Sequence, residues 1–199
     1  PCARVAIEAG ASMIGVGDST EALELREAGI LAPILVLGAV IEEEIGWVVS
    51  YDITPTIHSA GMVPRIAEEA RRQGKRQKVH LKLDTGMGRW GLSELPESTT
   101  TGVVGLMTHL ATADSDPDFA RAQVERFEEA TKAHAHLIRH AANSAAALRV
   151  PEARLDAARC GIALYGLSPF GGDPSEDGLE PVLRWESRLG QVKRLRAGE

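Results

Sequence analysis

Residues 79–92 read VHLKLDTGMGRWGL, a short alternating strand that leads into a glycine-rich turn. Three polar residues alternate with two leucines, so an extended chain places the polar groups on one face and the leucines on the other. The polar residues are His80, Lys82 and Asp84, and Arg89 follows where two glycines force the chain to turn. Strand ends that carry such groups form the active sites of α/β barrels. The alternative is a strand with a solvated polar face and an ordinary glycine turn.

Composition bounds the class of protein. With 199 residues, of which 44% are hydrophobic, the chain can bury one sizeable core, and its net charge of −6 argues against nucleic acid or an anionic membrane surface as partner. No apolar run approaches the roughly 18 residues of a spanning helix, and no signal-peptide pattern opens the chain, so we expect a cytoplasmic protein. Cys2 and Cys160 are expected to be free thiols, and no metal site is expected. The chain starts at Pro1 without Met and stops in mid-pattern at Glu199, which suggests a piece of a longer protein.

Apolar strand-like segments alternate with helical segments along most of the chain. Strands are expected at residues 12–16, 33–37, 52–56, from 79, and at 103–107, 137–142 and 155–159. Helices are expected at 3–9, about 18–28, 42–49, 62–73, 118 to about 134, and 145–148. This alternation predicts a parallel sheet, and its length favours an incomplete (β/α)8 TIM-type barrel that lacks at least its first strand. The polar segment 93–101 is too short and too poor in helix formers to cover a barrel strand well.

The composition changes near residue 170. We expect residues 1–170 to form the barrel domain, and residues 171–199 to form a linker and the first strand or strands of a β-rich C-terminal domain. The linker is rich in Gly, Pro and acidic residues, and residues 180–195 then alternate as a β element would. The apolar residues available for burial there are Val182, Trp185, Leu189, Val192 and Leu195.

A barrel gathers the carboxyl ends of its strands on one rim. The residues expected on that rim are Leu37, Lys82, Asp84, Arg89, His109, Asn143, Ser144, Arg159, Gly161 and Ile162. Ser144 precedes a short expected helix, and Gly161 permits a close approach of backbone N–H groups, so both suit a phosphate. Alternatively, Ser144 only caps its helix and Gly161 only relieves a bend.

Several motifs, in the same order along the chain, resemble alanine racemase, a pyridoxal 5′-phosphate (PLP) enzyme of fold-type III. They read LKLDTGMGRWG, THLATAD, HAANSAA and RCGIALYG, preceded by EAGAS, EALELREAG and PILVLG. The resemblance extends over nearly the whole chain, from Ala3 to Glu199.

The resemblance implies a role for each matched residue. Arg89 matches the arginine that contacts the phenolate side of the cofactor and the substrate carboxylate, and Lys82 a lysine that is carbamylated in many members and fixes that arginine. Arg159 matches the arginine at the pyridine nitrogen, with His109 supporting it. The phosphate-site positions correspond to Asn143, Ser144, Gly161 and Ile162, and a residue lining the cofactor pocket corresponds to Leu37.

These assignments agree with the chemistry of racemisation. An arginine stays protonated and leaves the pyridine nitrogen unprotonated, which weakens the electron sink and restricts side reactions such as transamination. A buried Lys82 has a depressed pKa, and its neutral amine can take up CO2 to become an anion that pairs with Arg89. The alternative is an unmodified Lys82 in an ion pair with Asp84.

The resemblance also implies a function and a set of partners. The family interconverts L-alanine and D-alanine, supplies D-alanine for peptidoglycan, and acts as a homodimer. No residue here matches the lysine that attaches the cofactor, neither Tyr51 nor Tyr165 matches the tyrosine on the opposite face, and the helix after GMGRWG is largely absent. We therefore expect this chain alone to be inactive.

Three other functions stay open. A PLP-binding barrel of the homeostasis type would bind the cofactor without turnover, a fragment could act as an interaction module, and a racemase could prefer another small amino acid such as serine. His134, His136 and His140 could suggest a metal, but their spacing spans a helix end and a strand, so we expect surface or core histidines.

Overall fold

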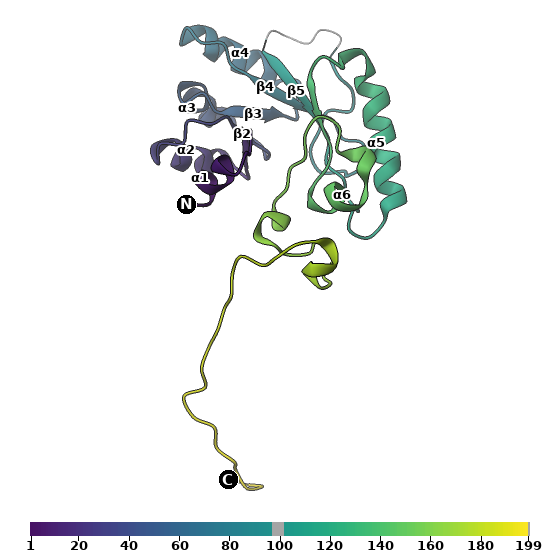
Figure 1. Cartoon of the computed structure of the whole chain (residues 1–199). Coiled ribbons are helices and arrows are strands. Elements are labelled where there is room, and N and C mark those ends of the chain that lie inside the picture. The colour runs from purple at the N-terminus through teal and green to yellow at the C-terminus, as the bar shows by residue number, and fades with distance from the viewer. Residues whose placement is uncertain (97–101, 199) are drawn as a thin grey trace.

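The computed structural model describes residues 1–96 and 102–198 (Figure 1). Six parallel strands form one sheet in the order β1-β2-β3-β4-β5-β6. The strands are β1 (Ile14–Val16), β2 (Ile34–Val36), β3 (Thr54–Ile57), β4 (Val79–Lys82), β5 (Val103–Met107) and β6 (Ile138–His140). A doubly wound sheet reverses its strand order at a switch point, whereas this order never reverses. The fold is therefore a curled, open part of a (β/α)8 barrel, as the sequence predicted.

Helices alternate with the strands and lie outside the sheet (Figure 1). They are α1 (Cys2–Glu8), α2 (Ser19–Glu27), α3 (Ile45–Ser50), α4 (Met62–Arg72), α5 (Pro117–Thr131) and α6 (Ser144–Arg149). Asp18 caps α2 by accepting from the Glu21 amide at 2.9 Å. Asp116 caps α5 in the same way, with Pro117 as its first residue. Short 3₁₀ turns occupy Glu42–Glu44, Lys132–His134, Pro151–Ala153, Ile162–Tyr165 and Pro174–Asp177. No helix in residues 1–96 and 102–198 combines the length and apolar character needed to cross a bilayer.

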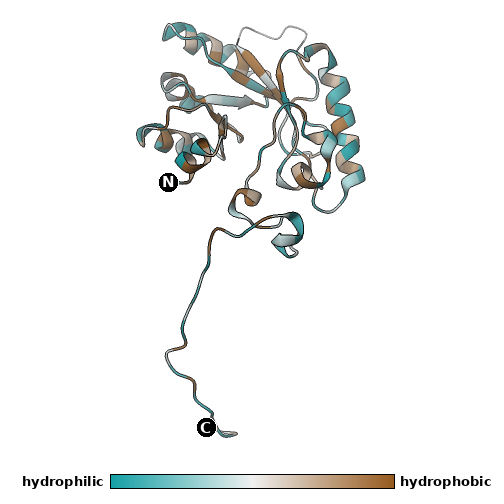
Figure 2. Ribbon diagram, in the orientation of Figure 1, coloured by the Kyte–Doolittle hydropathy of each residue, from teal (hydrophilic) through white to brown (hydrophobic). Residues whose placement is uncertain are grey.

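The two faces of β4 differ as its alternation predicts. Leu81 belongs to the hydrophobic core together with Ile66 of α4 and Phe127 of α5. Figure 2 shows both hydropathy colours along α5, as expected for a helix with one buried side. The opposite face of β4 is polar but not solvated, because only 1% of His80 and 3% of Lys82 is exposed. The alternative of a strand with a solvated polar face is therefore wrong.

The strand expected at residues 155–159 does not form. Leu155 has φ of +44°, which breaks an extended run before it can pair regularly. The segment still follows β6, because the Asp156 amide donates to the Arg139 carbonyl and the Arg159 amide donates to the Ala142 carbonyl. Arg159 therefore reaches the rim of the sheet from an irregular segment.

The C-terminal part leaves the body of the molecule as an extended trace (Figure 1). Residues 179–198 contain no strand or helix. Their apolar side chains are exposed, and Trp185 and Leu189 are 89% and 84% exposed. Of the segment expected to cover the barrel poorly, residues 97–101 lie outside the described residues.

Candidate functional site

The turn after β4 is organised by one carboxylate. Asp84 Oδ1 accepts the amides of Gly86 and Met87 at 2.9 Å, and Gly88 donates to both carboxylate oxygens. These N–H donors lower the pKa of Asp84. The turn closes where the Leu92 amide donates to the Lys82 carbonyl at 2.7 Å. Asp84 is thus a structural anchor for the loop that carries Arg89.

Lys82 and Arg89 lie against the same indole. The Lys82 Nζ atom is 5.6 Å from the ring centroid of Trp90, and the Arg89 Cζ atom is 5.1 Å from it. Burial, then the positive charges of Arg89 and Arg159, lower the pKa of Lys82 to about 8. Among the described residues no ion pair joins Lys82 to Asp84, so the alternative of a lysine–aspartate pair is wrong in this structure.

Arg159 is held by acceptors from two strand ends. Nη1 donates to His140 Nδ1 at 2.8 Å and to the His140 carbonyl at 3.0 Å. Nη2 donates to the Thr108 carbonyl at 2.8 Å and to the Ala141 carbonyl at 3.0 Å. Burial lowers the pKa of Arg159 to about 10, which still leaves it cationic at neutral pH. None of the hydrogen bonds that Arg159 makes in the described part of the chain uses its Nε–H, which is left free to donate.

His109 lies beside this guanidinium, with Nδ1 3.5 Å from Arg159 Nη2. Burial lowers its pKa to about 4, and the positive charges of Arg159, Lys82 and Arg89 act in the same direction. His109 is therefore neutral at neutral pH. Gln123 of α5 fixes the backbone of His109, since its side-chain amide nitrogen donates to the His109 carbonyl at 3.2 Å.

Ser144 and Gly161 form a second polar group at the rim. Ser144 is the first residue of α6, and the cap is Asn143, whose Oδ1 accepts the Ala146 amide at 3.0 Å. The alternative that Ser144 only caps its helix is thus wrong. Ser144 Oγ instead accepts the amides of Gly161 and Ala163 at 3.0 and 3.4 Å. With both lone pairs engaged, its O–H is left to donate, and it has no acceptor among the described residues.

Nine of the ten predicted rim residues form two groups and two further positions, and the tenth, Asp84, anchors the turn after β4. Lys82, Arg89, His109 and Arg159 are close enough to shift the pKa values of Lys82 and His109. Asn143, Ser144 and Gly161 form the second group, which adjoins the first because the Arg159 amide donates to Ala142. Ile162 is 45% exposed beside Gly161, and Leu37 lies over Gly15 of β1. A hypothetical Cβ on Gly161 would have no neighbour within 4 Å, so there is open space beside the Cα atom of Gly161.

Sequence reasoning missed the polar side chains that support this site. Gln123 is fully buried, and Thr85 and Thr108 share a hydrogen bond of 2.7 Å behind the Asp84 turn. It also assigned no role to His140, whose Nε2 lies 2.8 Å from Nδ1 of His80. A glycine in the middle of β5, which lies between these two histidines, was the one signal that could have indicated the contact.

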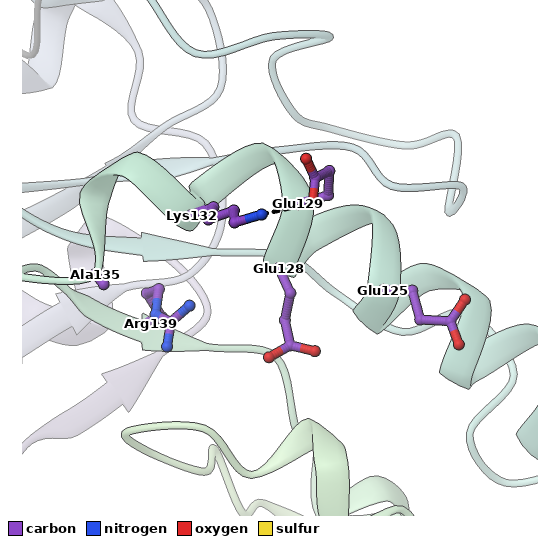
Figure 3. Close-up of a pocket in the computed structure, with 6 residues that line it drawn as sticks. All are labelled: Glu125, Glu128, Glu129, Lys132, Ala135 and Arg139. Carbon is purple, nitrogen blue, oxygen red and sulfur yellow. Dashed lines mark ion pairs between the residues drawn. The ribbon is translucent and has the colours of Figure 1, made fainter.

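Two pockets lie outside this group. One of about 400 Å³ lies beside the Asp84 turn, and its lining residues include Asp84, Gly88 and Ser93. The other, of about 420 Å³, lies between the end of α5 and β6 and is lined by Glu125, Glu128, Glu129, Lys132, Ala135 and Arg139 (Figure 3). A dashed line in Figure 3 marks the ion pair between Glu129 and Lys132. Its N···O distance is 3.9 Å, both side chains are exposed, and none of the residues that line this pocket is a predicted site residue.

Comparisons with known proteins agree with the fold and with the motifs. Residues 1–169 match the family model described as alanine racemase, N-terminal domain. An alanine racemase of Symbiobacterium thermophilum is 42% identical over 213 residues, which cover all of this chain and 56% of that protein. An alanine racemase of Desulforamulus reducens is 40% identical and is covered over 58% of its length.

A solved structure gives the same result. The crystal structure of an alanine racemase from E. faecalis superposes with a TM-score of 0.85 at 35% identity, over 99% of this chain and 57% of that one. The chain thus spans little more than half the length of the relatives that it matches. From the family match, these identities and the shared barrel, we conclude that this chain belongs to the alanine racemase N-terminal domain family.

Proposed function

We propose that this chain is the cofactor-binding barrel part of an alanine racemase, which uses PLP to interconvert L-alanine and D-alanine. The observation that carries the proposal is the position of Arg159, whose Nη atoms are held by protein acceptors while Nε–H is left without one. A fixed cation with one unused donor at the rim suits a heterocyclic nitrogen acceptor.

The residues present fit a pyridoxal phosphate. Such a group offers a ring nitrogen at one end, and Arg159 can donate to it from Nε. It offers an anionic phosphate at another end, where the unused O–H of Ser144 and the open space at Gly161 are suited to receive it. We propose Asn143 and Ile162 as neighbours of that phosphate and Leu37 as an apolar wall of the cofactor pocket.

When bound, PLP supplies the electron sink for the carbon that loses its proton. Arg159 would donate one hydrogen bond to the ring nitrogen without giving up its own proton, because its pKa of about 10 keeps it cationic. The sink would therefore be weaker than one with a protonated nitrogen, which favours return of the proton over side reactions. His109 would stay neutral beside Arg159 and would not compete with it for that nitrogen.

Arg89 would bind the substrate carboxylate and the phenolate side of the cofactor, from a loop fixed by Asp84. We propose that Lys82 is carbamylated and orients Arg89 as an anion. Three observations support this: Lys82 is buried, no carboxylate is paired with it among the described residues, and its pKa of about 8 makes the neutral amine accessible.

The whole protein requires more than this chain. We propose that residues 1–170 are the barrel domain and that residues 171–199 lead into a β-rich domain, which would cover the apolar residues exposed after Leu179. We further propose a homodimer in the cytoplasm, in which D-alanine is made for peptidoglycan. These proposals follow from the family resemblance.

The test compares the 199-residue chain with the full-length gene product that contains it. We expect the full-length protein to convert L-alanine to D-alanine with a PLP absorbance band, and the 199-residue chain to show no turnover. Arg159→Leu in the full-length protein should abolish turnover, whereas His136→Leu, an exposed histidine, should not alter it. A full-length protein that binds PLP but racemises neither alanine nor serine would favour the noncatalytic barrel instead.

A further inference from the structure

Two imidazoles extend from Arg159 into the interior of the sheet. Arg159 Nη1 lies 2.8 Å from His140 Nδ1, and His140 Nε2 lies 2.8 Å from His80 Nδ1. A guanidinium has only N–H donors, so His140 Nδ1 must accept from it. The hydrogen of a neutral His140 is then on Nε2, which donates to His80 Nδ1. Because Nδ1 of a neutral His80 accepts this hydrogen bond, the hydrogen of His80 is on Nε2. Arg159 therefore donates to His140, and His140 donates to His80.

Both rings are neutral in this position. The exposed fractions of His80 and His140 are 1% and 3%. Burial, followed by the positive charge of Arg159, lowers the pKa of His80 to about 4 and that of His140 to about 2. The far nitrogen of His80, Nε2, is buried without a hydrogen-bond partner in the described part of the chain. The direction of these two hydrogen bonds is thus set by Arg159, because no acceptor lies beyond His80 in the described part of the protein.

Gly105 explains how a residue of β4 reaches a residue of β6. Strand β5 lies between them, and His80 is in register with Gly105. A Cβ on residue 105 would lie 2.4 Å from Cε1 and 2.5 Å from Nδ1 of His80. The imidazole therefore crosses β5 through the space that any other side chain would fill. A glycine at this position is the condition for the contact between the two histidines.

We propose that His80 and His140 are positioning residues for Arg159, and that together they hold the guanidinium through a side-chain acceptor of fixed tautomer. If His140 adopted the other tautomer, its Nδ1–H would face an N–H of Arg159, and the contact would become repulsive. The acceptor of His140 Nε2–H, which is His80, therefore stabilises the tautomer that Arg159 requires. The catalytic meaning of this pair rests on the proposed function, because Arg159 is the group proposed to contact the cofactor.

The first test reads the tautomers directly in the full chain without cofactor, by NMR of ¹⁵N-labelled histidine. We expect both His80 and His140 to carry hydrogen on Nε2. His80→Gln keeps an oxygen acceptor for His140, whereas His80→Phe keeps a ring but removes the acceptor. His140 should keep its tautomer in the first variant, whereas the second should show a measurable fraction of Nδ1–H, because only the contact with Arg159 then favours Nε2–H. Gly105→Ala should act like His80→Phe although it removes no polar group. A wild-type protein with Nδ1–H on His140 would overturn the proposal.

The second test measures kcat/KM and the PLP dissociation constant of the full-length gene product. His80→Phe should lower kcat/KM about tenfold, the value of one hydrogen bond to a charged group. His80→Gln should retain most of the activity, and His136→Phe, at an exposed position, should retain all of it. Equal losses in the Gln and Phe variants would show a packing role and overturn the proposal. If the wild-type protein binds no PLP, the proposed function fails, while the NMR result still decides the tautomers.

Discussion

At the scale of single residues, burial determines which side chains of the site are charged at neutral pH. Lys82 and the three histidines near Arg159 all lie where the charged form is disfavoured, and their pKa values are lowered. Arg159 keeps its charge because it has four oxygen and nitrogen acceptors at 2.8 to 3.0 Å. The site therefore contains one firmly held cation among groups that are neutral or easily made neutral.

Carbamylation of Lys82 can be measured on the chain itself. With a pKa of about 8, the neutral amine becomes the major form above pH 8, so ¹³C-labelled bicarbonate should give a carbamate NMR signal that grows as the pH rises through 8. Lys82→Met should remove the signal. Lys75→Met should not, because the Lys75 ammonium donates to the carbonyl oxygens of Val49 and Ser50 and pairs with Asp52. A signal that persists in Lys82→Met would contradict the prediction.

The buried histidines should make the protein sensitive to acid. The unfolded chain takes up a proton on His80 near pH 6.5, whereas the folded chain does so near pH 4, so stability is full above 6.5 and falls as the pH drops toward 4. A shift of this size corresponds to about 3 kcal/mol of unfolding free energy. Urea unfolding at several pH values measures it, and His80→Gln should flatten the decline. An unchanged slope in that variant would refute the assignment.

At the element scale, the loop from β4 to Leu92 depends on a glycine that has no room for a side chain. Gly91 has φ of +152°, and a Cβ there would lie 2.4 Å from the Asp84 nitrogen. Gly88 also has a positive φ, +71°, but a Cβ on it would meet nothing within 4 Å. A substitution at Gly88 would therefore add backbone strain alone, whereas one at Gly91 would add backbone strain and steric overlap.

We expect Gly91→Ala to cost about 3 kcal/mol or more and Gly88→Ala about 1 kcal/mol. Both strain the backbone, but only the first forces a methyl group into the main chain of the strand that carries Lys82. Thermal or urea unfolding of the two variants measures the difference. Equal losses would mean that the loop moves aside at little cost.

Strands with alternating or continuous apolar residues, and helices with a capping residue, could be predicted from the sequence. Strands at 79–82 and 103–107 and the capped helix after Asp116 follow from alternation and from capping residues. The failed strand at 155–159 depended on the backbone angle of Leu155, which an apolar pattern does not reveal. The contact between His80 and His140 joins residues 60 positions apart, so only the glycine between them could have indicated it. The roles assigned to the rim residues stay predictions.

At the scale of the whole molecule, the body is compact but residues 180–198 expose a series of apolar side chains. Val192 is 79% exposed, in addition to Trp185 and Leu189. A chain that ends at Leu183 should therefore bind less of a hydrophobic dye and associate less, with an unchanged thermal midpoint, because residues 184–198 contribute no buried core. Dye fluorescence and light scattering test this, and a lowered midpoint would show that the tail packs on the body.

Because the sheet is open, the strand order fixes the direction in which a further strand could join it. Strand β6 is followed along its flank by the segment that carries Arg159, whereas the outer flank of β1 has no strand against it among the described residues. Any strand recruited to that flank, from whatever polypeptide, would have to run parallel to β1 to continue the ring. Its last residue would then arrive on the same rim as Lys82 and Arg159. The direction of β1 thus determines that the side chain at the carboxyl end of an added strand would lie on the rim that carries Lys82 and Arg159.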